Sequence, residues 1–378
     1  MSSVSADAVQ QALAGVDDPE IRRPITELGM VASVDIAADG RVAVTVLLTV
    51  SGCPMRTEIV DRVTAAVSSV PGVTGVSVQL DVMNEEQRTT LRESLRGPTR
   101  EIVFNKPGNL TRVYAVASGK GGVGKSSITV NLAAAMAARG LAVGLLDADI
   151  YGHSIPRMLG LDRPPTVVDG MLLPPEANGV RAISMLPFKP GGSAEPVAFR
   201  GPMLHRALEQ FLTDVWWGDL DILFLDLPPG TGDVAISSVQ LLPDSELIVV
   251  TTPQQAAAEV AVRAGMLALQ TKQKVVGVIE NMSAFACPHC GEPIDMFGHG
   301  GGDTVAATLS QALNTSIPVL GRVPFDSRLR EGGDDGHPLV LTDPESAAGS
   351  AIDAIAAGLA ERRRGLAGLN LGVTPAGR

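Results

Sequence analysis

Cysteine and aromatic residues are scarce in this chain of 378 residues. It has only three cysteines, too few for a disulfide framework, and this favours a reducing compartment. Aromatic residues make up 3% of the chain and apolar residues 45%, so we expect cores built from aliphatic side chains. The length exceeds what one hydrophobic core usually supports, and two domains are therefore expected.

Long apolar runs and an excess of basic residues are also missing. The run Val42–Val50 contains threonines and predicts a strand, not a membrane span. The first seven residues lack the basic and apolar regions of a secretory signal. The formal net charge of −11 argues against nucleic acid and anionic membranes as partners. These absences predict a cytoplasmic protein with no nucleic-acid or membrane partner.

The most informative stretch is the glycine-rich segment after the apolar run Val113–Ala117. Gly119, Gly124, Lys125 and Ser126 fit the phosphate-loop spacing G-x-x-x-x-G-K-[ST]. In such loops the backbone N–H groups and the next helix N-terminus bind phosphate, the lysine reaches the β- and γ-phosphates, and the hydroxyl binds Mg²⁺. The segment therefore predicts a nucleoside triphosphate site. Lys120 is unusual because it adds a second lysine to the loop.

Apolar runs that alternate with helical patterns surround this loop. They are Val113–Ala117, Val143–Leu146, Ile222–Leu225, Leu247–Val250, Val275–Ile279 and Val319–Val323. This alternation predicts a doubly wound α/β domain with a mainly parallel sheet. Ligands of such sheets bind where the strands have their carboxyl ends.

Polar side chains stand at three of these strand ends. Asp147 and Asp149 end one run, Asp226 ends a second, and Asn281 ends a third. A strand-end carboxylate of this kind holds the Mg²⁺ shell in phosphate-loop enzymes. The Asn281 amide is able to pair with a purine edge through its donor and acceptor, although a strand-end Asn is also a common structural residue.

The first 95 residues predict a small separate α/β domain. Helices are expected at Ser5–Ala14 and Met55–Val70, and strands at Val31–Ile36, Arg41–Thr49 and Val73–Val82. Three segments of this domain, Asp18–Glu20, Leu28–Val31 and Leu48–Pro54, resemble the MIP18-like (DUF59) domain of iron–sulfur assembly factors. In that family the cysteine before proline is a functional position.

Two interpretations of Cys53 stay open at this point. It precedes a predicted helix, whose N–H groups and dipole would lower the thiol pKa and make Cys53 an accessory reactive thiol. Alternatively, it is a small residue packed at a turn.

The other two cysteines form a Cys-x-x-Cys pair, Cys287 and Cys290. One chain has too few cysteines for four thiolate ligands, but two chains related by a two-fold axis supply four, as an iron–sulfur cluster or tetrahedral zinc requires. Zinc within one chain, with His289 or His299, is a second interpretation. A redox or purely structural pair is a third.

The loop Gly119–Ser126 with its extra lysine resembles the deviant Walker A motif of the MinD/ParA/nitrogenase-iron-protein superfamily. The resemblance implies that Lys120 reaches the partner's nucleotide in a homodimer. It further implies that Asp149 positions the attacking water, that Asp147 and Asp226 lie near Mg²⁺ with Ser126, and that Asn281 lies at the adenine. The residues implied to bind ATP are Gly119, Lys120, Gly121, Gly122, Val123, Gly124, Lys125, Ser126, Ser127 and Asn281. Lys120, Lys125 and Asp149 are the implied catalytic residues.

Further motifs make the resemblance more specific. Asp147–Ser154, Asp226–Asp233, Asn281–Ser283, Cys287–Cys290 and Gly298–Gly302 resemble the Mrp/ApbC family of iron–sulfur cluster carrier ATPases, with His153 where proline is expected. The resemblance covers nearly the whole chain. It implies ATP hydrolysis, a [4Fe–4S] cluster held between subunits by Cys287 and Cys290, and transfer to apo iron–sulfur proteins together with assembly factors.

The sequence thus predicts four parts. They are a MIP18-like domain (1–95), a linker or ordered lead-in (96–112), a deviant Walker A ATPase domain with the cysteine pair (113–365) and a flexible tail (366–378). The main alternative is a MinD/ParA-like positioning or partition ATPase without a cluster, and a nitrogenase-iron-protein-like reductase is a third possibility.

Overall fold

The structure is a computed structural model that describes residues 4–96, 101–149, 152, 154–184, 201–271, 273–287 and 289–361. The chain divides into two compact units. The first comprises Met1–Glu101, Pro165–Pro175 and Asp214–Gly218, and the second comprises Ile102–Pro164, Glu176–Thr213 and Asp219–Arg378. The first unit thus extends beyond the predicted boundary at residue 95 and takes in two later segments. The predicted tail lies outside the described residues.

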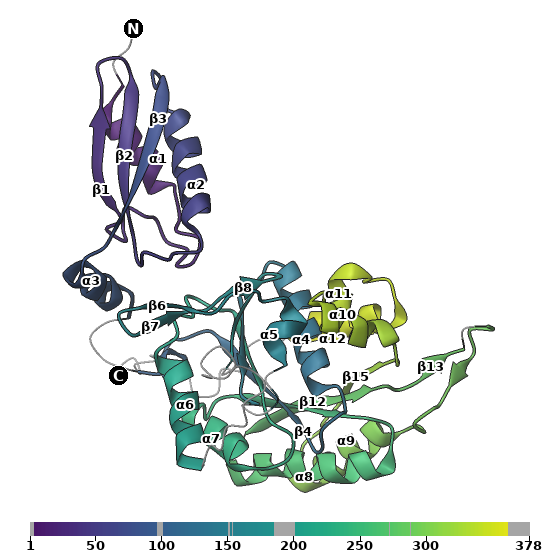
Figure 1. Cartoon of the computed structure of the whole chain (residues 1–378). Coiled ribbons are helices and arrows are strands. Elements are labelled where there is room, and N and C mark those ends of the chain that lie inside the picture. Colours follow the sequence, from purple (N-terminus) through teal and green to yellow (C-terminus); the bar gives the residue numbers. More distant parts are fainter. Residues whose placement is uncertain are drawn as a thin grey trace, which may run out of the picture. The chain divides into compact units, whose positions relative to one another are not determined.

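The first unit is a three-stranded sheet with helices against it (Figure 1). Its elements are α1 (Ala6–Ala14), β1 (Val31–Ile36), β2 (Arg41–Leu48), α2 (Arg56–Ser68), β3 (Gly75–Val82) and α3 (Glu85–Arg96). The central strand β2 pairs antiparallel with β1 and parallel with β3. The helices and strands predicted for this part are confirmed, whereas α3 was not predicted.

A hairpin from the middle of the chain completes the core of the first unit. It consists of β6 (Thr166–Val168) and β7 (Met171–Leu173). Val168, Met171 and Leu173 are buried in the same cluster as Leu91 and Leu95 of α3. At its tip, Asp169 forms an ion pair of 2.8 Å with Arg92 of α3. Helix α3 is therefore held by tertiary contacts, because only two of its twelve residues are large apolar side chains.

The second unit is built on an eight-stranded sheet of order β15-β12-β11-β4-β10-β5-β9-β8. The strands are β4 (Arg112–Ser118), β5 (Val143–Asp147), β8 (Glu176–Ala177), β9 (Val180–Ile183), β10 (Ile222–Asp226), β11 (Glu246–Thr251), β12 (Lys274–Asn281) and β15 (Val319–Val323). All neighbours pair parallel except β8 and β9. The six predicted strands and the mainly parallel, doubly wound fold are confirmed; β8 and β9 extend the sheet beyond them.

Helices cover both faces of this sheet (Figure 1). One face carries α4 (Lys125–Ala138), α5 (Ile155–Leu159), α10 (Ser327–Asp335), α11 (Leu339–Thr342) and α12 (Ala347–Glu361). The other carries α6 (Gly201–Thr213), α7 (Asp233–Leu241), α8 (Gln255–Thr271) and α9 (Gly301–Leu313). Helix α4 is buried along most of its length, which explains its run of alanines and aliphatic residues. This burial fixes the helix that follows the glycine-rich loop.

The described part of the predicted linker is an ordered lead-in to β4. It contains the short 3₁₀ turn η1 (Val103–Asn105), in which Phe104 is buried. The Asn105 side chain donates a hydrogen bond of 2.8 Å to the carbonyl of Leu241. No helix within the described ranges has both the length and the apolar character that a membrane crossing requires.

Candidate functional site

The phosphate loop (residues 119–126) joins β4 to α4 and is shaped by close backbone approaches. A Cβ on Gly119 would lie 2.3 Å from the carbonyl carbon of Val260 in α8. A Cβ on Gly124 would lie 2.2 Å from Nδ2 of Asn281, and the Gly124 φ of +80° is itself strained for other residues. Glycine is therefore required at both positions by the fold, before any ligand is considered.

Asp226, the last residue of β10, is the polar centre of the site. One of its oxygens lies 2.7 Å from Nζ of Lys125 and accepts a 2.6 Å hydrogen bond from the Ser126 hydroxyl. Its other oxygen accepts a 2.9 Å hydrogen bond from Thr129. Lys125 is only 6% exposed and Asp226 is fully buried. Desolvation opposes the burial of two charges, and the hydrogen bonds from Ser126 and Thr129 to Asp226 offset this cost, so the loop lysine is held beneath the pocket.

Asp147 lies beside Asp226, because the two residues are register partners on adjacent strands. Its carboxylate accepts hydrogen bonds from the Ser184 hydroxyl (3.0 Å) and from the backbone N–H of Asp149 (3.1 Å). Burial raises the pKa of Asp147 well above its usual range, and the neighbouring charge of Asp226 adds to this shift. A divalent cation at this strand edge would relieve the repulsion between the two carboxylates.

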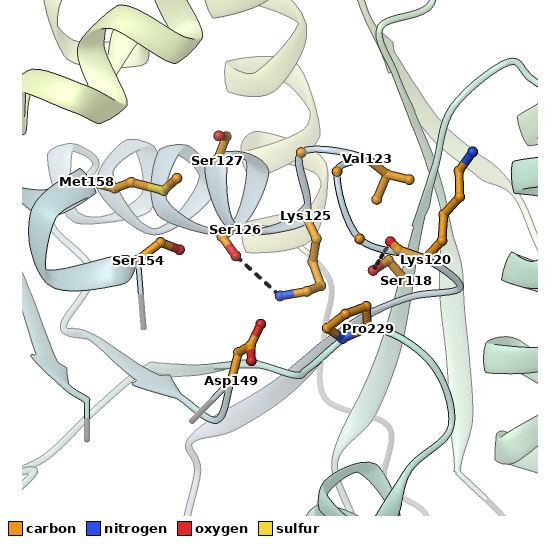
Figure 2. A pocket seen from close by; sticks show the side chains of 13 residues that line it. Ser118, Lys120, Val123, Lys125, Ser126, Ser127, Asp149, Ser154, Met158 and Pro229 are labelled. Carbon is orange, nitrogen blue, oxygen red and sulfur yellow. Dashed lines mark hydrogen bonds between the residues drawn. The ribbon is translucent and has the colours of Figure 1, made fainter. Parts of the chain in front are cut away.

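A pocket opens above these residues (Figure 2). Its lining consists of Ser118, Lys120, Gly121, Gly122, Val123, Gly124, Lys125, Ser126, Ser127, Asp149, Ser154, Met158 and Pro229. The structure thus brings residues 120–127 of the predicted loop and Asp149 together around one cavity, whereas Gly119 and Asn281 are not part of its lining. The Asp149 carboxylate faces the pocket and the Lys125 ammonium (Figure 2), and one of its oxygens accepts a 3.0 Å hydrogen bond from Gly152 N–H.

Lys120 points away from Lys125 and Asp149, although it belongs to the same loop (Figure 2). Its ammonium donates a 3.1 Å hydrogen bond to the side-chain oxygen of Gln254, directly before α8. Lys120 therefore lines the pocket, while its ammonium is held beside the start of α8.

Asn281 contacts the loop itself. Its Nδ2 donates a 2.9 Å hydrogen bond to the carbonyl of Val123, and the residue is 3% exposed. The amide therefore braces the phosphate loop in this state. A role at the adenine stays a prediction.

The Cys287 and Cys290 pair lies on a cysteine hairpin, which is β13 (Phe285–Ala286), β14 (Pro293–Ile294) and the residues between them. The hairpin projects away from the sheet (Figure 1). Cys290 is exposed and Cys287 is half-buried. The backbone N–H groups of Cys290 and His289 hold the pKa of the Cys287 thiol below its ordinary value. Within the described residues, no cluster of three or more His, Cys, Asp or Glu side chains is arranged to hold a metal.

Cys53 has the opposite environment. It is 4% exposed in the core of the first unit, and its sulfur lies 3.8 Å from a carboxylate oxygen of Glu20. Burial raises the pKa of its thiol to about 11, and the charges of Glu20 and Asp18 act in the same direction. Of the two interpretations of Cys53, the reactive thiol with a lowered pKa does not fit this structure, because burial and the nearby acids outweigh the helix N-terminus. The alternative of a packed residue fits the observed geometry.

Three residues of the site were not predicted from the sequence. Ser184 and Thr129 hold Asp147 and Asp226, and Gln254 holds Lys120. Thr129 lies one helical turn after Lys125, which places both side chains on the same face of α4, and this spacing is the one signal that the sequence offers. Ser184 and Gln254 carry no local signal, since each reaches its partner only through the sheet.

A glycine-rich loop between a central parallel strand and a buried helix, with carboxylates at the neighbouring strand ends, defines a P-loop NTPase. Comparison with known proteins refines this class. Residues 109–360 match a family model described as NUBPL iron-transfer P-loop NTPase, and residues 6–79 match one described as iron-sulfur cluster assembly protein.

Full-length relatives and a solved structure agree with these matches. An iron-sulfur cluster carrier protein of Mycobacterium tuberculosis is 61% identical over 373 residues, which are 98% of this chain and 97% of the relative. One of Deinococcus radiodurans is 42% identical over 356 residues, 94% of each chain. A nucleotide-binding protein of Archaeoglobus fulgidus, solved with ADP, is 37% identical with a TM-score of 0.50 over 60% of this chain and 86% of its own. The chain therefore belongs to the NUBPL iron-transfer P-loop NTPase family and carries an N-terminal iron–sulfur cluster assembly domain.

Proposed function

We propose that this protein is an iron–sulfur cluster carrier whose ATP binding and hydrolysis control a homodimer, with a [4Fe–4S] cluster between the subunits as cargo. The observation that carries the proposal is the cysteine hairpin. It presents two thiols at the surface, one with a lowered pKa, in the same unit as a phosphate loop. A lowered pKa increases the thiolate fraction, and the thiolate is the form that binds iron.

The ligand count supports the dimer. A [4Fe–4S] cluster takes four thiolates. The chain has three cysteines, and Cys53 is buried in the first unit, so each chain offers the pair Cys287 and Cys290. Two copies related by a two-fold axis supply four thiolates. The names of the full-length relatives, iron-sulfur cluster carrier protein, support an iron–sulfur cargo. In this proposal the partners are apo iron–sulfur proteins and assembly factors.

The donor set at the strand ends fits Mg²⁺. The Ser126 hydroxyl and the carboxylates of Asp226 and Asp147 are hard oxygen ligands on adjacent elements, and Mg²⁺ prefers such ligands. When bound, the ion would neutralise charge on the β- and γ-phosphates. The Ser126 hydroxyl and the carboxylates of Asp226 and Asp147 would hold the ion, and the Lys125 ammonium, which lies 2.7 Å from Asp226, would contribute positive charge beside the phosphates.

The remaining residues have roles in this proposal that follow from their positions. Lys125 stabilises charge on the γ-phosphoryl group, and Asp149 orients the attacking water from the opposite side of the pocket. Lys120 leaves Gln254 and reaches the nucleotide of the partner subunit. Asn281 contacts the adenine through its free amide oxygen while its Nδ2 holds the loop.

Anaerobic reconstitution tests the cargo. Wild type is compared with Cys287→Ala/Cys290→Ala, and Cys53→Ala serves as the matched control, since it removes one thiol outside the hairpin. Iron, acid-labile sulfide and visible absorbance are expected in wild type and in Cys53→Ala and are expected to be lost in the double variant. Equal iron and sulfide in all three proteins would refute the proposal.

The transfer step needs its own measurement. The loaded protein is mixed with an apo iron–sulfur protein, with and without ATP, and the acceptor is reisolated and its activity measured. Cluster on the acceptor is expected. A cluster that stays on the carrier while electrons are delivered would instead indicate a reductase.

A further inference from the structure

Two consecutive residues at the end of β12 hold different parts of the second unit. Asn281 donates to Val123 of the phosphate loop at 2.9 Å. Glu280 accepts a 2.6 Å hydrogen bond from the backbone N–H of Gly302, in the first turn of α9. Consecutive side chains of a strand point to opposite faces of the sheet. The end of β12 therefore links the phosphate loop on one face with the start of α9 on the other.

The chain between these two contacts carries the cysteines. It leaves β12 at Met282, whose φ of +57° is unusual for a residue with a side chain. It returns at Gly301, where a Cβ would lie 2.5 Å from the carbonyl oxygen of Thr252. At Gly302 a Cβ would lie 2.9 Å from Cβ of Glu280. Both ends of the cysteine-bearing segment are thus fixed close to the end of β12.

The base of the cysteine hairpin is packed rather than loose. Phe325 packs against two aromatic rings of the segment, and its ring centroid lies 5.9 Å from that of Phe285 and 6.4 Å from that of Phe297. The N–H of Cys287 donates a 2.9 Å hydrogen bond to the carbonyl of Glu292 across the hairpin. A displacement of the backbone at either end of the segment therefore also displaces the cysteines, because the packed base of the hairpin cannot absorb it.

Burial of the Glu280 carboxylate is energetically unfavourable, which is unusual for a residue with a purely structural role. Glu280 is 2% exposed, and a buried carboxylate requires compensation. Arg322 of β15 supplies part of it at 3.6 Å and also binds Asp303 of α9 at 2.6 Å. Glu280 and Arg322 thus connect β12 with β15 next to the cysteine hairpin, whereas the Arg322–Asp303 pair is exposed and contributes little.

We propose that Glu280 is a positioning residue that couples the phosphate loop to the cysteine hairpin, so that nucleotide binding changes how the two thiols are presented. A ligand that moves Val123 acts on Asn281, the adjacent Glu280 moves with it, and Glu280 displaces the start of α9 and the segment that ends there. This inference rests on the proposed function, and deepens it by naming the connection between nucleotide and cargo.

Hydrogen–deuterium exchange of the full-length, cluster-free protein tests the coupling without any need for a cluster. Exchange is compared with and without ADP for residues 119–126 and for residues 283–302. In wild type we expect ADP to change exchange in both segments. In Glu280→Ala the change in 119–126 should persist, while that in 283–302 should fall on the order of fivefold or more. Glu280→Gln retains an acceptor for Gly302 and should give an intermediate value.

The matched control is Asp303→Asn, which weakens the exposed ion pair with Arg322 and leaves the Glu280–Gly302 hydrogen bond in place. It should behave as wild type. A wild-type response confined to residues 119–126, or a full response of residues 283–302 in both Glu280 variants, would overturn the coupling. An absence of any ADP effect in wild type would overturn the proposed function as well, so the two failures are distinguishable. If Glu280→Ala does not fold, Glu280→Gln alone decides the comparison.

A second readout uses the loaded protein. The rate at which an iron chelator bleaches the visible absorbance is measured with and without ATP. We expect nucleotide to change this rate in wild type and in Asp303→Asn, and to change it severalfold less in Glu280→Ala. Equal nucleotide effects in all three proteins would also overturn the proposal.

Discussion

The phosphate loop and the cysteine hairpin are both short turns of the second unit that contain glycine and a potential ligand site, yet their surroundings differ. The loop is pinned from outside by Val260, Asn281 and Asp226, each far away in sequence. The hairpin is held at its base, while its thiol-bearing turn relies on local hydrogen bonds and is exposed at Cys290. The loop is thus preorganised to bind a molecule of fixed shape. The hairpin instead presents two thiols, and further thiols from another molecule are needed to complete the coordination of a cluster.

The largest difference between the phosphate loop and the cysteine hairpin is expected in the loss of stability when a glycine is replaced by alanine. Gly119→Ala places a Cβ 2.3 Å from the backbone of Val260 and should destabilise the protein by about 3 kcal/mol, with loss of ADP binding. Gly291→Ala in the hairpin meets no atom within 4 Å and suffers only from its φ of +76°, which should cost about 1 kcal/mol. Urea unfolding measures both. Gly121→Ala, which meets no atom and has no positive φ, is the control within the loop.

A second difference lies in the thiols of the two units. Alkylation requires the thiolate, so the lowered pKa of Cys287 and the raised pKa of Cys53, about 11, predict that Cys287 reacts at least about 100-fold faster at pH 7.5. The Cys53 rate should keep rising until the pH passes about 11 or the protein unfolds. Mass spectrometry after timed iodoacetamide labelling measures both rates. Labelling in urea should remove most of the difference; equal rates in the native protein would contradict the assignment.

The pinned loop region should also show a conflict between stability and function. The pKa of Asp147 is raised in the folded state, so its charge destabilises the fold above that pKa, and the cost disappears as the pH falls below the unfolded value. Asp147→Asn should therefore stabilise the nucleotide-free protein by about 1–2 kcal/mol at pH 7.5 while reducing Mg²⁺-dependent ATPase activity. Urea unfolding at pH 7.5 and at pH 5 should show this gain shrinking at the lower pH. A destabilised variant at pH 7.5 would refute it.

The smallest effect is expected from a substitution at Gln254, which binds Lys120 of the phosphate loop directly before α8. Gln254→Ala removes one hydrogen bond to Lys120, worth about 1 kcal/mol. If Lys120 must leave Gln254 to act in the partner subunit, the variant should dimerise with ATP at roughly threefold lower protein concentration. Analytical ultracentrifugation measures this. Gln255→Ala is the neighbouring control, since its side chain is exposed.

The phosphate loop was predictable because its information is contiguous. Gly119, Gly124, Lys125 and Ser126 lie within eight residues, and the strand and helix on either side follow from local apolar patterns. The strand-end positions of Asp147 and Asp226 follow from the same patterns, because parallel strands bring their carboxyl ends to one edge.

Contacts between distant residues were not predictable. Asn281 reaches Val123 across 158 positions, and Gln254 reaches Lys120 across 134. Neither contact can be detected from the residue types next to the two partners in the sequence. Helix α3 was missed because its apolar pattern is short and its stability comes from the β6–β7 hairpin. The two interpretations of Cys53 could not be separated from the sequence, because the following helix is visible there but the burial beside Glu20 is not.

The hairpin β6–β7 gives the chain an unusual connectivity. Its residues Val168, Met171 and Leu173 belong to the core of the first unit, although they fall within the part that matches the NTPase family. The chain passes between the units repeatedly, not once. A chimera that exchanges only residues 1–95 with a relative would therefore combine the new domain with a hairpin adapted to the old one. Recombination between such proteins preserves the fold only when the hairpin is exchanged together with the domain it completes.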